Sequence, residues 1–502
     1  MNIDFLASID AGTGSIRALV YNIKSKKIVF SQDEWLYQPD PKGPEGSLLF
    51  NPDDFFQKSI KVFIEALKKS DLPGNPVGAI TFTSMRDGVI FLDQNKKEIY
   101  CGPNIDSRIM ADTWPSENDN RNTYLKSGRW IIPLFLSYRL QWFKTCRPEI
   151  FTKIKTVLSM TDWFSFKYCG ECYSEPTNSG ETGLFDVQKR DWNYELINEF
   201  QFPEGIFPKV IECGTKIGNI TKIVADLIGI SEKTTMITGG ADTQFACLGS
   251  GAYIPGDLTI VAGTWGPIQL ITEKPKFDKE MRTWTGCSVI PGTWSLESTS
   301  MMIGLVHRWI MDTMYSGLSD PYDIMENEAV SVLMSDPNLF SYVGVGLMDA
   351  KKLELVPNGA IIIPSIYCLT RQMRRGHFTH AAYMSTCFSA AYNFEQIEKI
   401  NPQIKNIHLC GGVSRSNIWV EMITNTIGRE IVLPEFPEAT GLGGIIAAGV
   451  GTGIWDWEEG TQIIVKTKSK FPDMKKTKQY SELFKKWKDN YSAVVEMRNK
   501  LS

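Results

Sequence analysis

Residues 10–17 read DAGTGSIR, and this stretch decides the fold expected for the chain. An apolar run from Phe5 ends at Asp10, two glycines follow closely, and a second apolar run begins a few residues later. This pattern predicts two strands joined by a tight turn. Glycines let the backbone turn sharply and point N–H groups at an anion, and the hydroxyls of Thr13 and Ser15 add donors. The turn therefore predicts a phosphate-binding hairpin, although an ordinary glycine-rich hairpin uses the same residue types.

The residues that follow extend the hairpin into an α/β domain. A third strand is expected over 28–32, and a helix should begin at Asn51–Pro52, where Asn caps and Pro occupies the first helical position. A strand over 79–83 runs into the polar sequence SMRDG at 84–88. Since ligands of α/β sheets bind beyond the carboxyl ends of strands, this sequence is a candidate substrate site.

The second half of the chain repeats this organisation. A strand over 258–261 runs into GTWG at 263–266, and a strand over 407–410 runs into Gly411–Gly412 and a helical pattern. A chain of 502 residues suits two large domains, which we expect over 1–250 and 251–502. The apolar spacing over 477–498 predicts a final amphipathic packing helix.

Composition excludes several classes of function. The chain has 43% apolar and 22% charged residues and a formal net charge of −4, which gives no basic footprint for nucleic acid. No apolar run reaches membrane-spanning length and no secretory signal is evident, so we expect a cytoplasmic protein without a membrane partner. A homodimer is left open.

The cysteines do not indicate a metal or disulfide framework. Ten cysteines are irregularly spaced, and only Cys169 and Cys172 have a C-x-x-C spacing. A zinc site would require two further ligands, which the sequence does not offer in a matching context. We therefore expect a turn with two incidental, reduced thiols.

Three stretches carry a resemblance to a known family. The sequence contains no P-loop motif, and residues 411–417 do not match the dinucleotide-binding fingerprint. Any nucleotide-binding site must therefore be of another class. DAGTGSIR, GGADTQFACLGSG at 239–251, and the late Gly411–Gly412 with ATGLGG at 439–444 follow the order found in the FGGY carbohydrate kinases. The chain resembles that family over nearly its whole length, and within it is most similar to the autoinducer-2 kinases.

The resemblance implies a fold, a reaction and ligands. It implies an α/β, two-domain actin-like ATPase (ribonuclease H-like) fold with the active site in the cleft between the domains. ATP and Mg²⁺ would be the nucleotide and the metal ion, and the acceptor would be a hydroxyl of a small polyol or sugar. Autoinducer-2 in its linear dihydroxypentanedione form is the expected acceptor. A pentulose such as xylulose, glycerol or erythritol, and a non-catalytic nucleotide-binding regulator, are the alternatives.

The resemblance also implies residue roles. Asp242 would be the general base and contact the substrate, although an Asp there can also cap a helix. Asp10 would lie near Mg²⁺, because a carboxylate at that strand end requires a cation between itself and phosphate. The other expected substrate ligands are Arg86, Asp87, Asp106 and Asp162. The expected phosphate and nucleotide ligands are Thr13, Gly14, Ser15, Arg17, Gly263, Thr264, Gly411, Gly412 and Ser416.

The sequence departs from the family pattern at two places. Family patterns often carry Asn at the position of Ser416. After RGHF at 375–378 the chain reaches the strand at 407 sooner than family members usually do. We expect a shortened element there, on the side of the domain that binds nucleotide.

Overall fold

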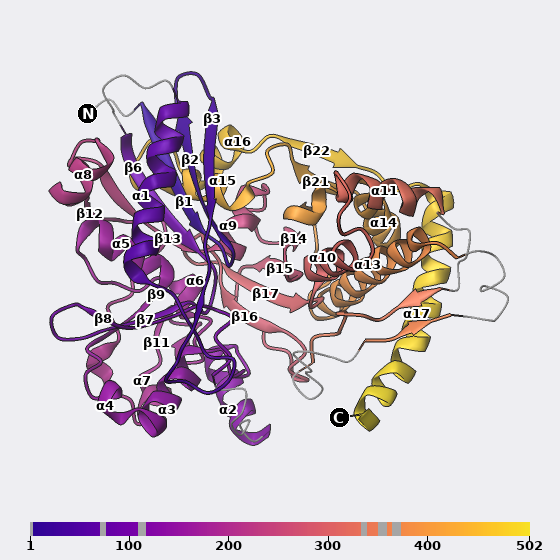
Figure 1. Ribbon diagram of the computed structural model, residues 1–502, viewed down its shortest axis with the longest axis horizontal. Coiled ribbons are helices and arrows are strands. Elements are labelled where there is room, and N and C mark those ends of the chain that lie inside the picture. The colour runs from indigo at the N-terminus through magenta and orange to yellow at the C-terminus, as the bar shows by residue number, and fades with distance from the viewer. Residues whose placement is uncertain are drawn as a thin grey trace.

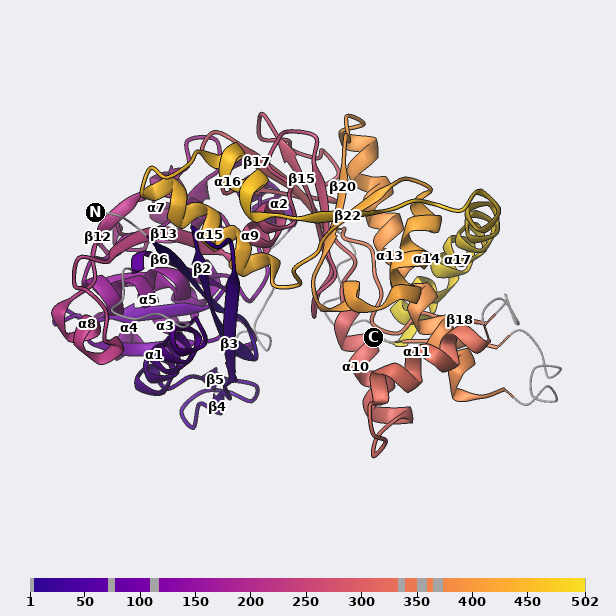
Figure 2. The ribbon, with the colours of Figure 1, turned by 90° about the horizontal axis from the view of Figure 1, so that it is seen from above.

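The chain forms two lobes, each built on one large β-sheet (Figures 1 and 2). The computed structural model describes residues 4–70, 77–108, 117–332, 339–349, 359–363 and 373–501. None of the helices in these ranges is both long enough and apolar enough to cross a membrane.

The first sheet has the strand order β12-β13-β6-β1-β2-β3. Strands β1 to β3 form an antiparallel meander, and β6 and β13 continue the sheet parallel to β1. The expected strands around DAGTGSIR are confirmed. The bounds are β1 Phe5–Ala11, β2 Ser15–Asn22, β3 Ile28–Glu34, β6 Val77–Ser84, β12 Lys216–Asn219 and β13 Thr235–Ala241.

The second sheet repeats this topology in the order β16-β17-β15-β14-β20-β21-β22. Strands β14, β15 and β17 form the meander, and β20 and β21 continue parallel to β14. The two glycine-rich hairpins, β1–β2 and β14–β15, thus occupy equivalent places in the two lobes. The bounds are β14 Leu258–Val261, β15 Pro267–Thr272, β16 Trp284–Cys287, β17 Trp294–Thr299, β20 Ile407–Cys410, β21 Ile431–Pro434 and β22 Thr467–Lys470.

Helices cover both faces of the first sheet. Helix α1 (Pro52–Lys69) and helix α5 (Met160–Cys169) pack on one face. The predicted cap of α1 is confirmed, because the Asn51 side chain accepts from the amides of Asp53 at 3.0 Å and Asp54 at 3.2 Å. Its buried face anchors the meander that carries the first hairpin.

The opposite face is covered by a helix from the far end of the chain. Helix α15 (Ala439–Gly451) packs on β1, β2, β6 and β13, and Figure 2 shows it in the lobe that contains the N-terminus. It crosses α9 (Asp242–Gly249) so closely that a Cβ at Gly249 or Gly443 would collide with the partner helix's backbone. Because α9 also contacts β14 and β20, this helix pair joins the two lobes.

An insertion between β6 and β13 enlarges the first lobe. It contains a three-stranded sheet ordered β8-β7-β9 and several short helices. Its elements are β7 Val89–Leu92, β8 Glu98–Gly102, α2 Glu117–Ser127, α3 Leu136–Cys146, α4 Pro148–Phe151, β9 Thr156–Ser159, α6 Pro176–Ser179, β10 Phe185–Asp186, β11 Asp191–Trp192, α7 Tyr194–Glu199, η1 Glu204–Ile206 and α8 Lys222–Ile228. The small ribbon β4 Gln38–Pro39 with β5 Leu48–Leu49 precedes α1.

The second lobe is largely helical around its sheet. The segment after RGHF is one unbroken helix, α13 (Arg375–Ile400), which leads directly toward β20. The final helix, α17 (Met474–Leu501), buries the expected apolar face around Trp487 in the lobe's core. The other elements are α10 Ile303–Met314, α11 Pro321–Ser331, β18 Phe340–Ser341, β19 Ile361–Ile362, η2 Gly412–Arg415, α14 Asn417–Ile427 and α16 Trp457–Ile464, which packs beside α15.

Candidate active site

Three parallel strands of the first sheet end in one row. Asp10 on β1 is in register with Thr83 on β6, and Gly240 on β13 is in register with the same Thr83. The next row joins Ala11, Ser84 and Ala241. The residues that leave these strands are therefore neighbours at one edge of the sheet: the first hairpin, Arg86 and Asp242.

Asp242 is the first residue of α9. The cap position belongs to Ala241, which offers no side-chain hydrogen bond, so the structure does not support the alternative in which Asp242 caps the helix. Thr243 donates to the carboxylate from its Oγ1 at 3.1 Å, and its backbone amide also contributes a hydrogen bond. Burial raises its pKa, and the positive charges of Arg86 and Arg17 oppose this shift. It forms no ion pair closer than 4 Å within the described chain, so its oxygens remain open to a ligand hydroxyl.

A buried carboxyl fixes the start of α9. The amide of Ala241 donates to Thr177 Oγ1 at 2.8 Å, and that hydroxyl donates to Glu175 Oε2 at 2.6 Å. Glu175 also caps the short helix α6. The sequence alone does not predict these hydrogen bonds next to Asp242, because Ala241 and Thr177 are more than sixty positions apart.

In the first hairpin protein donors bind the backbone carbonyls, and the Gly12 amide donates to the Ser15 carbonyl at 2.9 Å. Trp35 Nε1 donates to the carbonyl of Gly12 at 3.1 Å, and the Tyr37 hydroxyl donates to that of Thr13. The backbone amides of Thr13 and Gly14 have no partner in the described part of the chain. A Cβ built on Gly14 meets nothing within 4 Å, so open space adjoins these donors.

The second hairpin has the same arrangement. The amides of Gly304 and Leu305, at the start of α10, donate to the carbonyls of Gly263 at 2.9 Å and Thr264 at 3.4 Å. The amides of Thr264 and Trp265 have no partner among the residues described. Two hairpins with free N–H groups, one from each lobe, suit the oxygens of a polyphosphate.

Asp10 lies beneath the first hairpin. Its Oδ1 accepts from Thr83 Oγ1 at 2.9 Å, and its Oδ2 lies 3.4 Å from Arg17 Nη1. Burial raises the pKa of Asp10 to about 7; Arg17 lowers it, whereas Asp242 and Glu438 add to the rise. A buried carboxyl whose charge is poorly compensated fits a water-bridged cation. The described ranges contain no group of three or more His, Cys, Asp or Glu residues that could enclose a metal ion, and the placement of Mg²⁺ near Asp10 stays a prediction.

We expect Asp10→Asn to stabilise the protein, and more so at high pH. Folding raises the pKa of Asp10 from its ordinary 3.8 to about 7. Between these pH values the folded state binds a proton that the unfolded state has lost, so the stability of the wild type falls as pH rises. Asn does not titrate, and the variant avoids this loss. The gain in unfolding free energy should be about 2 kcal/mol larger at pH 8 than at pH 5 in urea unfolding. Asp226→Asn, on the exposed side of α8, controls for the loss of one negative charge. An equal gain at both pH values would contradict this environment for Asp10.

Two ion pairs that share Glu438 connect the lobes near the strand ends of the first sheet. Arg17 Nε lies 3.2 Å from Glu438 Oε2, and Arg415 Nη2 donates to Glu438 Oε1 at 3.0 Å. Glu438 directly precedes α15 and therefore ties the first hairpin's strand to η2 of the second lobe. Sequence reasoning identified Arg17 but not Glu438.

The element expected to bind adenine and ribose begins at Gly411. This residue has φ +98°, and a Cβ on it would lie 2.6 Å from the carbonyl of Ala262, so glycine is required there. Gly412 borders open space. The Ser416 hydroxyl caps α14 by accepting from the amide of Trp419 at 3.3 Å, which gives it a structural role. Nucleotide contacts of Gly411, Gly412 and Ser416 stay a prediction.

Arg86 occupies the expected strand-end position but is held by carboxylates. Its Nη1 donates to both Glu297 oxygens at 2.8 and 2.9 Å and lies 3.3 Å from Glu181 Oε2. Glu297 comes from β17, so Arg86 links the first lobe to the second sheet. Neither glutamate was singled out from the sequence.

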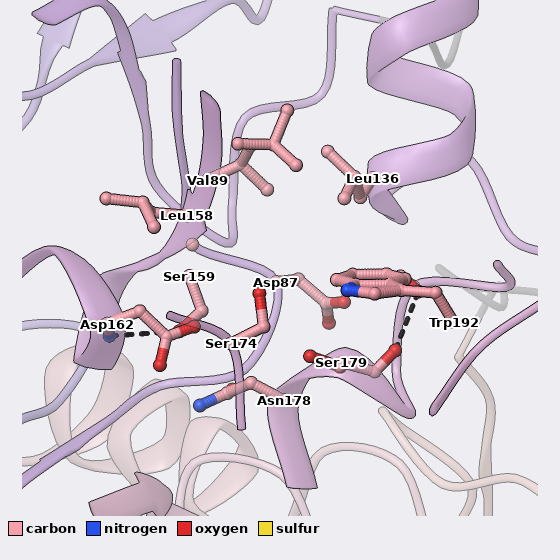
Figure 3. Close-up of a pocket in the computed structure, with 13 residues that line it drawn as sticks. Asp87, Val89, Leu136, Leu158, Ser159, Asp162, Ser174, Asn178, Ser179 and Trp192 are labelled. Atoms are coloured by element: carbon pink, nitrogen blue, oxygen red, sulfur yellow. Dashed lines mark hydrogen bonds between the residues drawn. The ribbon is translucent and has the colours of Figure 1, made fainter. Parts of the chain in front are cut away.

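Asp87 and Asp162 line one narrow pocket. Figure 3 shows it with the polar side chains of Ser159, Ser174, Asn178 and Ser179 and the apolar side chains of Val89, Leu136, Leu158 and Trp192. Burial raises the pKa of Asp87 to about 7. Asp162 accepts from Ser159 Oγ at 2.8 Å, and its other oxygen has no partner among the described residues. Burial, together with the negative charge of Glu175, raises its pKa well above the ordinary value. The two expected ligands thus lie together in the first lobe.

Asp106 has a different environment. It is wholly buried and accepts from the Leu48 amide at 3.0 Å, the Tyr100 hydroxyl at 2.5 Å and Arg108 Nε at 2.6 Å. Both oxygens are therefore used by protein donors. This geometry favours a structural ion pair for Asp106, and we leave it out of the proposed site.

The C-x-x-C pair ends a helix. Cys169 is the last residue of α5, and Gly170 caps the helix with φ 81°. Both thiols are free, and burial raises the pKa of Cys169 to about 11. The two cysteines thus lie at and just beyond the end of α5.

Comparison with known proteins places this geometry in context. Models of the FGGY family of carbohydrate kinases match residues 5–249 (N-terminal domain) and 258–452 (C-terminal domain). The autoinducer-2 kinase of Salmonella paratyphi B is 29% identical over 97% of this chain and 94% of its own length, and that of Yersinia enterocolitica 28% over 98% and 94%.

Solved structures share the fold at low identity. A ligand-bound xylulose kinase from Lactobacillus acidophilus superimposes with a TM-score of 0.88 at 19% identity, covering 99% of this chain and 100% of its own. A gluconate kinase from the same organism gives 0.87 at 19% identity, covering 99% of each chain. These neighbours confirm the expected two-domain α/β fold.

Proposed function

Because the chain belongs to the FGGY family of carbohydrate kinases, we propose that it transfers the γ-phosphate of ATP to a hydroxyl of a small polyhydroxylated molecule, with Asp242 as the general base. The observation that carries this proposal is the shared register of β1, β6 and β13. In this register Asp242, which has no ion-pair partner among the described residues, is a neighbour of the hairpin that carries the amides of Thr13 and Gly14. Phosphoryl transfer depends on such positioning of a base and of phosphate-binding donors.

The chain's own groups divide the work of the reaction. Asp242 accepts the proton of the acceptor hydroxyl as its oxygen bonds to the γ-phosphorus and the bond to the ADP oxygen breaks. The free amides of the two hairpins bind phosphate oxygens and hold them in line. Mg²⁺, bound near Asp10, would supply neutralisation of phosphate charge.

The acceptor that we propose is the linear form of autoinducer-2, dihydroxypentanedione. Support comes from the curated relatives, which are named autoinducer-2 kinases and align along 97–98% of this chain. Xylulose is the second candidate, because a xylulose kinase shares the fold over 99% of the chain. Glycerol and erythritol remain weaker alternatives.

A panel of acceptors tests this proposal. With ATP and Mg²⁺, ADP release should depend on the acceptor and be fastest with dihydroxypentanedione, because the relatives that align along 97–98% of this chain are autoinducer-2 kinases. Comparison of kcat/KM for dihydroxypentanedione, xylulose, glycerol and erythritol decides the substrate. A preference for xylulose would replace the proposed acceptor, whereas nucleotide binding without acceptor-dependent ADP release would favour the regulator.

A further inference from the structure

A charge cluster lies where the two lobes meet beside Asp242. It consists of Arg86, Arg129, Glu181 and Glu297, and the name is kept for these four residues. Arg129, Glu181 and Glu297 are 0–3% exposed at their side chains, and Arg86 is 17% exposed. The cluster is therefore buried except at Arg86.

Arg86 is anchored at one nitrogen only. All three of its contacts with Glu181 and Glu297 are made by Nη1. Its Nε and Nη2 have no partner within the described residues. The side chain can thus donate hydrogen bonds to a ligand while its charge is compensated from behind.

Further donors surround the two glutamates. Arg86, Arg129 and Gln269 hold the pKa of Glu297 below its ordinary value despite its burial, whereas burial raises the pKa of Glu181 and Arg129 and Arg86 oppose that rise. Arg129 Nη2 contacts Glu181 and lies 3.8 Å from Glu297, while its guanidinium stacks on the Trp284 ring at 4.6 Å. Gln244 Nε2 donates to Glu181 at 3.1 Å, and Gln269 Nε2 donates to Glu297 at 2.7 Å. Glu297 and Glu181 therefore lie against both arginines of the cluster, and Arg86 also opposes the rise that burial causes in the pKa values of the neighbouring carboxyls of Asp87 and Asp242.

We propose that Glu297, together with Glu181, makes this site selective for neutral acceptors by compensating the charge of Arg86. This inference rests on the proposed function, because it places the acceptor against Arg86. An uncompensated arginine binds carboxylates through two parallel hydrogen bonds. Here an acceptor carboxylate would approach Arg86 only by also approaching two glutamates, whereas a hydroxyl or ketone oxygen suffers no such repulsion.

Matched neutral and anionic acceptors test the proposal. Xylitol and xylonate differ by one carboxylate, and their binding is measured by calorimetry on wild type, Glu297→Gln and Glu181→Gln, with turnover measured in parallel. Wild type should bind xylitol more tightly. Each variant should shift the xylitol-to-xylonate affinity ratio toward xylonate by about tenfold or more, because one repelling charge is lost near the carboxylate.

Glu212, which is not part of the charge cluster, offers a matched control. Glu212 pairs with Arg190 through bonds of 2.6 and 2.7 Å, away from the cluster. Glu212→Gln loses a carboxylate from a comparable pair, and its affinity ratio should equal that of wild type. Thermal unfolding identifies any variant that fails to fold, and either of the two cluster variants suffices for the test.

The outcomes separate this inference from the proposed function. An affinity ratio that stays within about twofold of wild type in the folded cluster variants would overturn the role of the glutamates. A wild type that prefers xylonate would overturn it as well. The wild type could bind xylitol more tightly than xylonate and yet show no acceptor-dependent ADP release. That result would contradict the proposed function but not the selectivity of the site for neutral acceptors.

Discussion

Asp242→Asn should lower kcat by about 10² to 10⁴, the contribution of a positioned general base. The amide keeps the size of the side chain and can still accept from Thr243 Oγ1, so the start of α9 should not change. Nucleotide affinity and thermal unfolding should therefore stay close to those of wild type. Acceptor-dependent ADP release, measured at saturating ATP and acceptor, gives the loss in kcat.

The pH dependence of kcat provides an independent check. Burial raises the pKa of Asp242, and a base must be deprotonated to act, so wild-type kcat should fall on the acidic side at a pH above the ordinary titration of an aspartate. The residual activity of Asp242→Asn should lack this limb. A loss of less than about tenfold, or an unchanged acidic limb, would contradict the role of Asp242.

Gly14→Val should raise the KM for ATP by at least about tenfold, because its side chain would fill the space beside two free amides and prevent their hydrogen bonds to phosphate. Stability should change by less than about 1 kcal/mol, since Gly14 has no positive φ and a Cβ there meets no neighbour. Steady-state kinetics and urea unfolding measure the two effects.

Gly205→Val is the matched control for this substitution. Gly205 lies in η1 of the first lobe, also has open space around a built Cβ, and has no positive φ. It should leave the KM for ATP unchanged. If Gly14→Val had the same KM as this control, the first hairpin would not be a phosphate site.

Local features of the fold were predictable because they depend on neighbours in sequence. The hairpin at DAGTGSIR, the Asn51 cap and the apolar face of the final helix all follow from backbone preference and from periods of two or 3.6 residues. The strand-end placement of Arg86 followed from order along the chain, whereas the strand that ends before Asp242 was not predicted. The register that makes Arg86 and Asp242 neighbours did not follow from that order.

Long-range packing explains what the sequence could not supply. The contact of α15 with the first sheet joins residues over four hundred positions apart, as the close approach of Gly444 to Ser8 shows. The bond between Arg86 and Glu297 spans 211 positions. Asp106 looked like a candidate ligand because a carboxylate beside an arginine suits either a ligand or a buried ion pair. Only its three protein donors separate these roles.

Transfer of label from γ-labelled ATP distinguishes phosphorylation of an acceptor from hydrolysis of ATP. Purified protein is incubated with Mg²⁺, labelled ATP and dihydroxypentanedione or xylulose, and the label is followed into acceptor, inorganic phosphate and protein. Label should appear in the acceptor, at a rate that Asp242→Asn lowers by about 10² to 10⁴. Label that appears only in inorganic phosphate, at a rate that no acceptor changes, would contradict the proposed function.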